Sequence, residues 1–174
     1  VGAGARGMVG LALGVRPGDA DYEALRTEFL DTYEHESLVH TAVFEAMHPV
    51  LDKLDALGAR WGIVTNKAER FTHPIVQGLG LHRRAAVLVC GDTTPHSKPH
   101  PAPLLEAARR AGADADCCVY VGDDARDVQA GRAAGMATLA AAWGYLGQGE
   151  PIEAWGADAV LGEPAALLRW LAQR

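Results

Sequence analysis

The chain has 174 residues, which is enough for one ordinary domain or for one domain with part of a second. Hydrophobic residues make up 49% and charged residues 22%, as in folded globular domains, and no apolar run approaches the roughly 20 residues of a membrane-spanning helix. The formal net charge of -6 argues against nucleic acid, because binding to a phosphate backbone normally needs a basic surface. The composition therefore predicts a globular protein that binds neither membranes nor nucleic acid.

Two helices are expected at the start of the chain. The stretches from about residue 6 to 13 and from about residue 21 to 36 carry apolar residues at helical spacing. Pro17 and Gly18 interrupt this pattern, and they predict a break between the two helices.

From about residue 47 on, helical segments alternate with short apolar runs. The helices expected in this region cover residues 50–57, 69–79, 103–110, 128–134 and 165–171, and the expected strands cover residues 61–64, 87–89, 119–121 and 138–141. Such alternation is typical of a parallel sheet covered by helices, and strands that are apolar at nearly every position are buried on both faces. Residues 47–174 are therefore predicted to form a doubly wound α/β core.

The cysteines and the start of the chain indicate a cellular location. An odd number of cysteines within apolar stretches fits buried, reduced thiols better than disulfides, at Cys90, Cys117 and Cys118. The opening segment resembles neither a signal peptide nor a transit peptide, so we expect a cytoplasmic protein. The chain begins with Val1 rather than methionine, and we expect this start to be internal to a longer protein.

Polar residues follow three of the predicted strands directly. They are Thr65-Asn66-Lys67 after the first strand, Lys98-Pro99 after the second and Gly122-Asp123 with Asp127 after the third. In an open parallel sheet, ligands bind just beyond the carboxyl ends of the strands. We therefore expect these three segments to lie on one edge of the sheet.

Thr65 and Lys98 each have a functional and a simpler interpretation. The hydroxyl of Thr65 and the backbone N–H groups that follow it suit a phosphate oxygen, but a Thr-Asn pair by itself is more simply a helix cap. Lys98 is biased to an extended backbone by Pro99, which stiffens the segment, but a lone lysine in a proline-rich loop is more simply solvated.

The acidic segment suits a hard cation. Gly122 permits a sharp turn after the strand, and Asp123 and Asp127 are separated by one helical turn. Mg²⁺ prefers oxygen ligands and keeps several waters. One carboxylate can therefore bind the ion directly, while the other binds a water of its coordination shell. The alternative is structural, with Asp123 or Asp124 capping the helix and Asp127 interacting with its dipole.

The order of these segments resembles the second, third and fourth motifs of the haloacid dehalogenase superfamily, over about residues 50–145. Within it, Val64-Thr65-Asn66-Lys67 and Lys98-Pro99-His100-Pro101 are similar to phosphoglycolate phosphatases. A finer likeness, to bacterial N-acetylmuramic acid 6-phosphate phosphatases, rests on Gly2-Ala3-Gly4-Ala5-Arg6, the segment from Glu23 to Tyr33, and Trp143-Gly144-Tyr145.

This resemblance implies a Rossmann-like core over residues 47–174 and the C-terminal part of a helical cap over residues 1–46. The family's first motif, Asp-x-Asp-Gly-Thr after an N-terminal strand, does not occur in the sequence. Neither Asp19-Ala20-Asp21 nor Asp114-Ala115-Asp116 is placed as a nucleophile would be. We therefore expect a core that lacks its first strand and its nucleophile, and a chain that is inactive by itself.

By the same resemblance, the reaction is Mg²⁺-dependent hydrolysis of a small phosphate monoester, phosphoglycolate or N-acetylmuramic acid 6-phosphate, through an aspartyl-phosphate. Thr65 and Asn66 would bind the phosphoryl group, and Lys98 would neutralise its charge. Asp123 would bind Mg²⁺, and Asp127 would orient Lys98 or a metal-bound water.

Arg6 is the candidate for the rest of the substrate. It is flanked by Gly4 and Gly7, whose backbone lets a ligand approach closely, and a guanidinium can bind a carboxylate through two parallel hydrogen bonds. Both expected substrates carry a carboxylate. The alternative is that Arg6 is a solvated residue on the first helix.

Other classes fit the motifs less well. A receiver domain of bacterial signalling places its acidic pair before its lysine, whereas here Lys98 precedes Asp123. A haloalkanoate dehalogenase needs no metal and lacks the acidic pair. A phosphosugar mutase with the same motifs and a non-catalytic relative stay open as alternatives.

Overall fold

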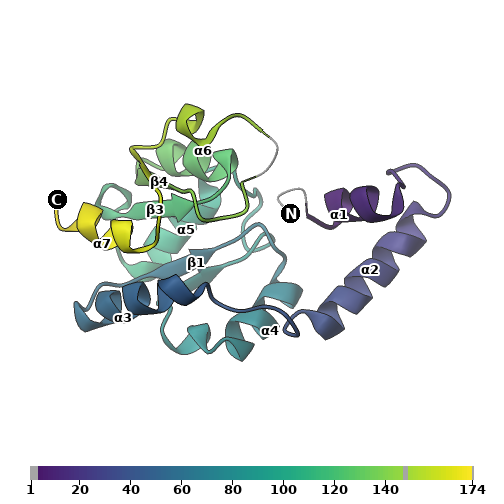
Figure 1. The fold of residues 1–174 in the computed structure, drawn as a ribbon, viewed down its shortest axis with the longest axis horizontal. Helices are drawn as coiled ribbons and strands as arrows, with labels where there is room; N and C mark the ends of the chain where they lie inside the picture. Colours follow the sequence, from purple (N-terminus) through teal and green to yellow (C-terminus); the bar gives the residue numbers. More distant parts are fainter. Residues whose placement is uncertain (1–3, 147–148, 174) are drawn as a thin grey trace. The chain divides into compact units, whose positions relative to one another are not determined.

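The computed structural model describes residues 4–146 and 149–173 (Figure 1). The chain divides into two compact units, of which the first ends at Ala42 and the second begins at Val43. The sequence predicted a boundary after residue 46. The assignment of the first unit to a cap stays a prediction.

The first unit is a pair of helices. Helices α1 (Gly4–Leu13) and α2 (Tyr22–Glu36) pack against each other, and their buried residues are Val9 and Tyr22. The backbone N–H of Arg16 donates to Asp19 Oδ2 at 2.7 Å in the turn between them. The break predicted from Pro17 and Gly18 therefore lies where the sequence placed it.

The second unit contains parallel strands in two separately hydrogen-bonded sheets. Within the described residues, β1 (Gly62–Val64) pairs with β2 (Val87–Val89), while β4 (Ala137–Ala141) pairs with both β3 (Val119–Gly122) and β5 (Ala159–Leu161). The predicted α/β class with parallel strands is confirmed. The ladder is not continuous, however, because no strand pairing joins β1 to β3 in this part of the chain.

The strand β5 was not predicted. It has only three residues and lies between Gly156 and Gly162, so its apolar run is too short to stand out from a loop. Its conformation depends on pairing with β4, in which Leu139 is opposite Ala159 and Ala141 is opposite Leu161. Because β4 is distant in the sequence, a local sequence pattern does not reveal this pairing.

The helices of the second unit follow the predicted segments closely. They are α3 (His48–Ala56), α4 (Glu69–Gly78), α5 (Ala102–Ala111), α6 (Ala125–Ala133) and α7 (Ala165–Leu171). Short 3-10 helices add η1 (Glu45–Met47), η2 (Leu81–Arg83), η3 (Ala115–Cys117) and η4 (Ile152–Trp155). Helix α6 begins earlier than predicted, because the side chain of Asp124 caps it.

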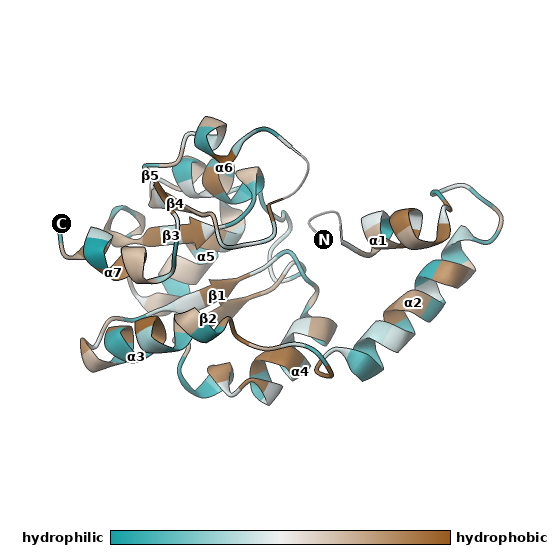
Figure 2. Ribbon diagram, viewed as in Figure 1, coloured by the Kyte–Doolittle hydropathy of each residue, from teal (hydrophilic) through white to brown (hydrophobic). Residues whose placement is uncertain are grey.

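Strand β3 shows that helices cover both faces of the strands. Val119 and Val121 pack against the core cluster built from α3, β4, β5 and α7, whereas Tyr120 packs against the cluster built from α5 and α6. Neighbouring residues of a strand point to opposite faces. The apolar strands, brown in Figure 2, therefore lie between two helical layers, as in a doubly wound core.

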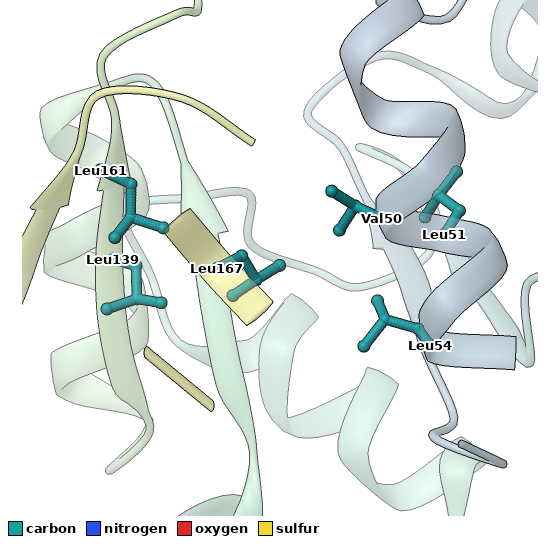
Figure 3. Packing of buried hydrophobic residues seen from close by; sticks show 6 residues of the cluster. All are labelled: Val50, Leu51, Leu54, Leu139, Leu161 and Leu167. Carbon is teal, nitrogen blue, oxygen red and sulfur yellow. The ribbon is translucent and has the colours of Figure 1, made fainter. Parts of the chain in front are cut away.

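The larger cluster holds α3 and α7 against the strands. In Figure 3, Val50 and Leu54 of α3 point toward Leu167 of α7, and Leu139 and Leu161 extend the same cluster from β4 and β5. Each of these side chains is at most 9% exposed, and full burial of a side chain of this size contributes about 1.5–3 kcal/mol. This packing fixes the position of the strand ends that carry the polar residues.

None of the described helices is long and apolar enough to cross a membrane. All three cysteines are free, but the prediction that they are buried holds only for Cys90; Cys117 is exposed and Cys118 is half-buried. The reason is that Cys117 ends the turn η3, before the strand β3 begins.

Candidate functional site

Thr65 lies at the carboxyl end of β1. Its backbone N–H donates to Val89 O at 2.9 Å, which continues the pairing of β1 with β2, and its Oγ1 accepts from Lys67 N at 3.1 Å. Helix α4 is capped instead by Asp92, whose Oδ1 accepts from Glu69 N at 2.9 Å. The alternative that Thr65 caps this helix is therefore wrong, and its hydroxyl holds the turn beyond the strand.

Asn66 joins this turn to the lysine loop. Its Nδ2 donates to Lys98 O at 2.9 Å, and its Oδ1 accepts from Lys98 N at 2.9 Å. The side-chain amide of Asn66 thus makes two hydrogen bonds to the backbone of Lys98, which is distant in sequence. Contact between Asn66 and a phosphoryl group stays a prediction, while positioning of Lys98 by Asn66 is observed.

Lys98 and Asp127 form a buried ion pair. Lys98 Nζ lies 2.8 Å from Asp127 Oδ1, and the two side chains are 10% and 9% exposed. Hence Lys98 is not the solvated loop residue of the simpler interpretation. Asp127 is held in turn by Asp123 N, which donates to Asp127 Oδ2 at 3.2 Å.

Tyr120 belongs to this site, although no sequence pattern pointed to it. Lys98 Nζ donates to the Tyr120 hydroxyl at 2.8 Å and to Val64 O at 3.2 Å, besides its bond to Asp127. An ammonium group has three donors, so each of them has an acceptor. Tyr120 was interpreted only as an apolar strand residue, and its spacing alone offers no signal for this role.

The Tyr120 hydroxyl stays protonated in this position. Burial, above all, raises its pKa well above the ordinary value, and the nearby charge of Asp127 acts in the same direction. The hydroxyl lies 3.2 Å from Val64 O, to which it can donate while it accepts from Lys98. Side chains from the β2–α5 loop and from β3 thus meet Val64 O, the last carbonyl of β1.

Asp123 lies at the carboxyl end of β3, and its carboxylate is oriented by the loop after β4. Asp123 Oδ2 accepts from Tyr145 N at 2.8 Å. Gly144 is close enough that an added Cβ would collide with the side chain of Asp123. Only a glycine lets this loop approach the carboxylate so closely.

Gly122 has the same relation to Asp127, because an added Cβ would collide with the Asp127 carboxylate. Gly122→Ala is therefore expected to displace Asp127 from Lys98 and to lower the free energy of unfolding by about 1–3 kcal/mol. Urea denaturation followed by circular dichroism measures the change.

The matched control is Gly162→Ala, since a Cβ at Gly162 would meet no atom within 4 Å. It should change the free energy of unfolding by less than about 0.5 kcal/mol. Equal stability of the two variants would mean that Asp127 adjusts to a methyl group without loss of its ion pair.

Asp124 has a structural role. Its carboxylate accepts from Arg126 N at 2.9 Å, which caps α6, and from Arg126 Nη2 at 2.6 Å. The hydrogen bonds from the Arg126 side chain, above all, hold the pKa of Asp124 below its ordinary value. The capping alternative thus applies to Asp124, while Asp123 and Asp127 face other partners.

The carboxylates fit a magnesium ion of the predicted kind. Mg²⁺ is usually bound through one or two protein carboxylates, and waters and phosphate oxygens complete its coordination. Asp123 is oriented by a backbone N–H on Oδ2, and no described residue donates a hydrogen bond to its Oδ1, whereas Asp127 is neutralised by Lys98. The described residues contain no group of three or more His, Cys, Asp or Glu side chains of the kind that holds a metal by itself.

Arg6 lies on α1, in the first unit. It lines an open hollow of ≈ 610 Å³, together with Gly7, Gly10, Val15, Arg16 and Pro17. The side chain is exposed. Its predicted contact with a substrate carboxylate stays a prediction.

Parallel strands between helical layers, with a lysine–aspartate pair and a second aspartate beyond the strand ends, define an α/β protein of the Rossmann-like type with a charged site at the carboxyl ends of its strands. The family model for haloacid dehalogenase-like hydrolases matches residues 15–141. The chain belongs to this family.

Relatives in sequence are named as phosphatases. An N-acetylmuramic acid 6-phosphate phosphatase of Pseudomonas putida is 41% identical over 167 residues, which cover 96% of this chain and 75% of the relative. A phosphoglycolate phosphatase of Xanthomonas campestris is 45% identical over 168 residues, again 96% of this chain and 75% of the relative.

Solved structures share the fold. A protein of Haemophilus somnus described as a predicted phosphoglycolate phosphatase has a TM-score of 0.83 at 22% identity, over 95% of this chain and 73% of its own. CbbY of Rhodobacter sphaeroides, solved in complex with phosphate, has a TM-score of 0.71 at 20% identity, over 94% and 75% of the two chains.

Proposed function

We propose that this chain supplies the phosphate-binding and magnesium-binding residues of a phosphatase that hydrolyses a small phosphorylated metabolite. The observation that carries the proposal is the buried ion pair of Lys98 and Asp127, in which Lys98 is held by Asn66 and Asp127 by the backbone N–H of Asp123. The names of its relatives make phosphoglycolate and N-acetylmuramic acid 6-phosphate the proposed substrates.

The proposed roles follow from charge and position, on which phosphoryl transfer chiefly depends. Thr65 and Asn66 bind the phosphoryl group, and Lys98 neutralises its charge. Lys98 already donates to three acceptors, so it must release Tyr120 or Val64 O to reach a phosphoryl oxygen while Asp127 retains it. Asp127 thereby acts as the positioning residue for Lys98.

Asp123 is the proposed direct ligand of Mg²⁺. When bound there, the ion supplies positive charge next to the phosphoryl oxygens. The backbone N–H of Tyr145 and the close approach of Gly144 keep the Asp123 carboxylate in one orientation. Arg6 is the proposed partner of the substrate's carboxylate.

The nucleophile is proposed to come from outside these 174 residues. It would be an aspartate that attacks phosphorus, with release of the alcohol and formation of an aspartyl-phosphate that water then hydrolyses. Three of the aspartates that follow β2 and β3 have other partners in the described chain: Asp92 caps α4, Asp124 caps α6 and Asp127 pairs with Lys98.

The 174-residue polypeptide is therefore expected to bind inorganic phosphate in the presence of Mg²⁺ without hydrolysing p-nitrophenyl phosphate. Phosphate binding follows from the charges that are in place, and the lack of turnover follows from the lack of a nucleophile. Isothermal titration calorimetry measures the binding, and release of p-nitrophenol measures the turnover.

Two lysine variants make the binding test specific. Lys98→Ala should abolish phosphate binding, whereas Lys53→Ala, which removes an exposed lysine of α3, should leave it unchanged. Equal binding by both variants would refute the role of Lys98. Turnover of p-nitrophenyl phosphate that Asp123→Asn abolishes would show that the chain does contain the nucleophile.

A further inference from the structure

Two exposed aromatic rings lie together in the second unit. The ring centroids of Phe44 and Tyr145 are 6.0 Å apart, with 38° between the ring planes. Phe44 is 46% exposed and Tyr145 is 65% exposed. The residues are far apart in sequence, so the fold rather than a local turn brings the rings to one place on the surface.

This pair adjoins the carboxylate that is proposed to bind magnesium. The backbone N–H of Tyr145 donates to Asp123 Oδ2 at 2.8 Å, and Gly144 packs directly against the Asp123 side chain. Trp143, in the same loop, packs against the core cluster of α3, α7 and the strands. The loop is thus anchored by Trp143 on its inner side and presents the ring of Tyr145 on its outer side.

Leu57 is an exposed apolar side chain elsewhere in this unit. Leu57, which is 64% exposed, directly follows α3 and precedes the amino end of β1. Single exposed apolar residues of this kind are normal on a protein surface. The pair of Phe44 and Tyr145 differs because its two rings are in contact and one of them is fixed to Asp123 through its own backbone.

We propose that Phe44 and Tyr145 form a platform that binds the ring of a phosphorylated sugar, and that they select a sugar phosphate over phosphoglycolate. This inference rests on the proposed function, because it assumes that the phosphoryl group binds beside Asp123 and Lys98. A sugar ring presents a face of C–H groups that can lie against aromatic rings. Glycolate has one methylene and one carboxylate, so it has no such face and gains nothing from the platform.

The expected contribution is that of an aromatic contact at a partly solvated site. Loss of one ring should weaken binding of a sugar phosphate by about three- to tenfold. Binding of inorganic phosphate and of phosphoglycolate should change by less than about twofold, because their charged groups lie against Asp123, Lys98 and the metal rather than against the rings.

The experiment titrates the 174-residue polypeptide, with Mg²⁺, with three probes: inorganic phosphate, phosphoglycolate and N-acetylmuramic acid 6-phosphate. The variants are Tyr145→Ala and Phe44→Ala, with Tyr145→Phe to retain the ring and Leu57→Ala as the exposed apolar control. All four keep the backbone N–H of Tyr145, and thermal unfolding verifies that they fold. Glucose 6-phosphate is a fourth probe, which has a sugar ring but no carboxylate. It therefore distinguishes contact with the sugar ring from contact with the carboxylate of N-acetylmuramic acid 6-phosphate.

Weaker binding of both sugar phosphates to Tyr145→Ala and Phe44→Ala, with wild-type affinity in Tyr145→Phe and Leu57→Ala, is the expected result. Equal losses of affinity for phosphate, phosphoglycolate and N-acetylmuramic acid 6-phosphate, or no loss for any of them, would overturn the platform. The proposed function would still stand in that case if phosphate binding depends on Lys98. Phosphate binding that does not depend on Lys98 would refute the proposed function, and the platform with it.

Discussion

Asp127→Ala is expected to lower the free energy of unfolding by about 3–5 kcal/mol, since it leaves the buried ammonium of Lys98 without its only charged partner among the three acceptors that the structure gives it. The ammonium group is 2.8 Å from the carboxylate in a site where both side chains are about one-tenth exposed. Urea denaturation, followed by far-UV circular dichroism, gives the change.

A double variant separates loss of the ion pair from loss of packing. Lys98→Met with Asp127→Leu removes both charges and keeps apolar volume, so it should be more stable than Asp127→Ala. Tyr120 and Val64 O still have each other as partners at 3.2 Å. A loss below about 1 kcal/mol in Asp127→Ala would mean that water reaches Lys98 and that the pair behaves as a surface ion pair.

The second large effect concerns turnover in a polypeptide that carries the proposed nucleophile. A chimera that joins this chain to the part of the Pseudomonas putida relative that it does not match is proposed to supply it, because the match covers 75% of that relative. In this chimera, Lys98→Ala and Thr65→Ala are each expected to lower kcat by on the order of a hundredfold, as loss of one charge-stabilising donor does.

Asp123→Ala should abolish the magnesium-dependent activity of the same chimera, measured as kcat against Mg²⁺ concentration with p-nitrophenyl phosphate as substrate. Asp124→Ala is the matched control, because its carboxylate caps α6 and binds Arg126 instead of facing the proposed metal. It should lower stability by about 0.5–2 kcal/mol and leave the magnesium dependence unchanged. Wild-type kcat in the Thr65, Lys98 and Asp123 variants would refute the assignment of the site.

Local sequence patterns were enough to predict most elements of the second unit. The strands β1 to β4 and the helices α3 to α7 were predicted within a few residues, because apolar periodicity and prolines or glycines at the ends act over a single segment. The division into two hydrogen-bonded sheets could not be predicted. Pairing depends on which strand edges meet, and a strand's own residues do not determine that.

The site shows the same division between local and long-range information. Thr65, Lys98, Asp123 and Asp127 could be nominated because each follows an apolar run, and parallel strands deliver such residues to one edge. The hydrogen bonds between the Asn66 side chain and the Lys98 backbone join residues that are 32 positions apart, and the bond from Lys98 Nζ to Val64 O joins residues that are 34 apart. No window of local sequence contains both partners of either contact.

The sequence by itself determined the family and the α/β class and nominated the charged residues of the candidate site, since these depend on residue types and their order along the chain. Only the tertiary structure decided that Tyr120 and Val64 O share the ammonium of Lys98 with Asp127, and that Phe44 and Tyr145 meet beside Asp123. The physical reason is that a hydrogen bond or an aromatic contact acts over a few ångströms, and the packing of helices on strands determines which distant segments come that close.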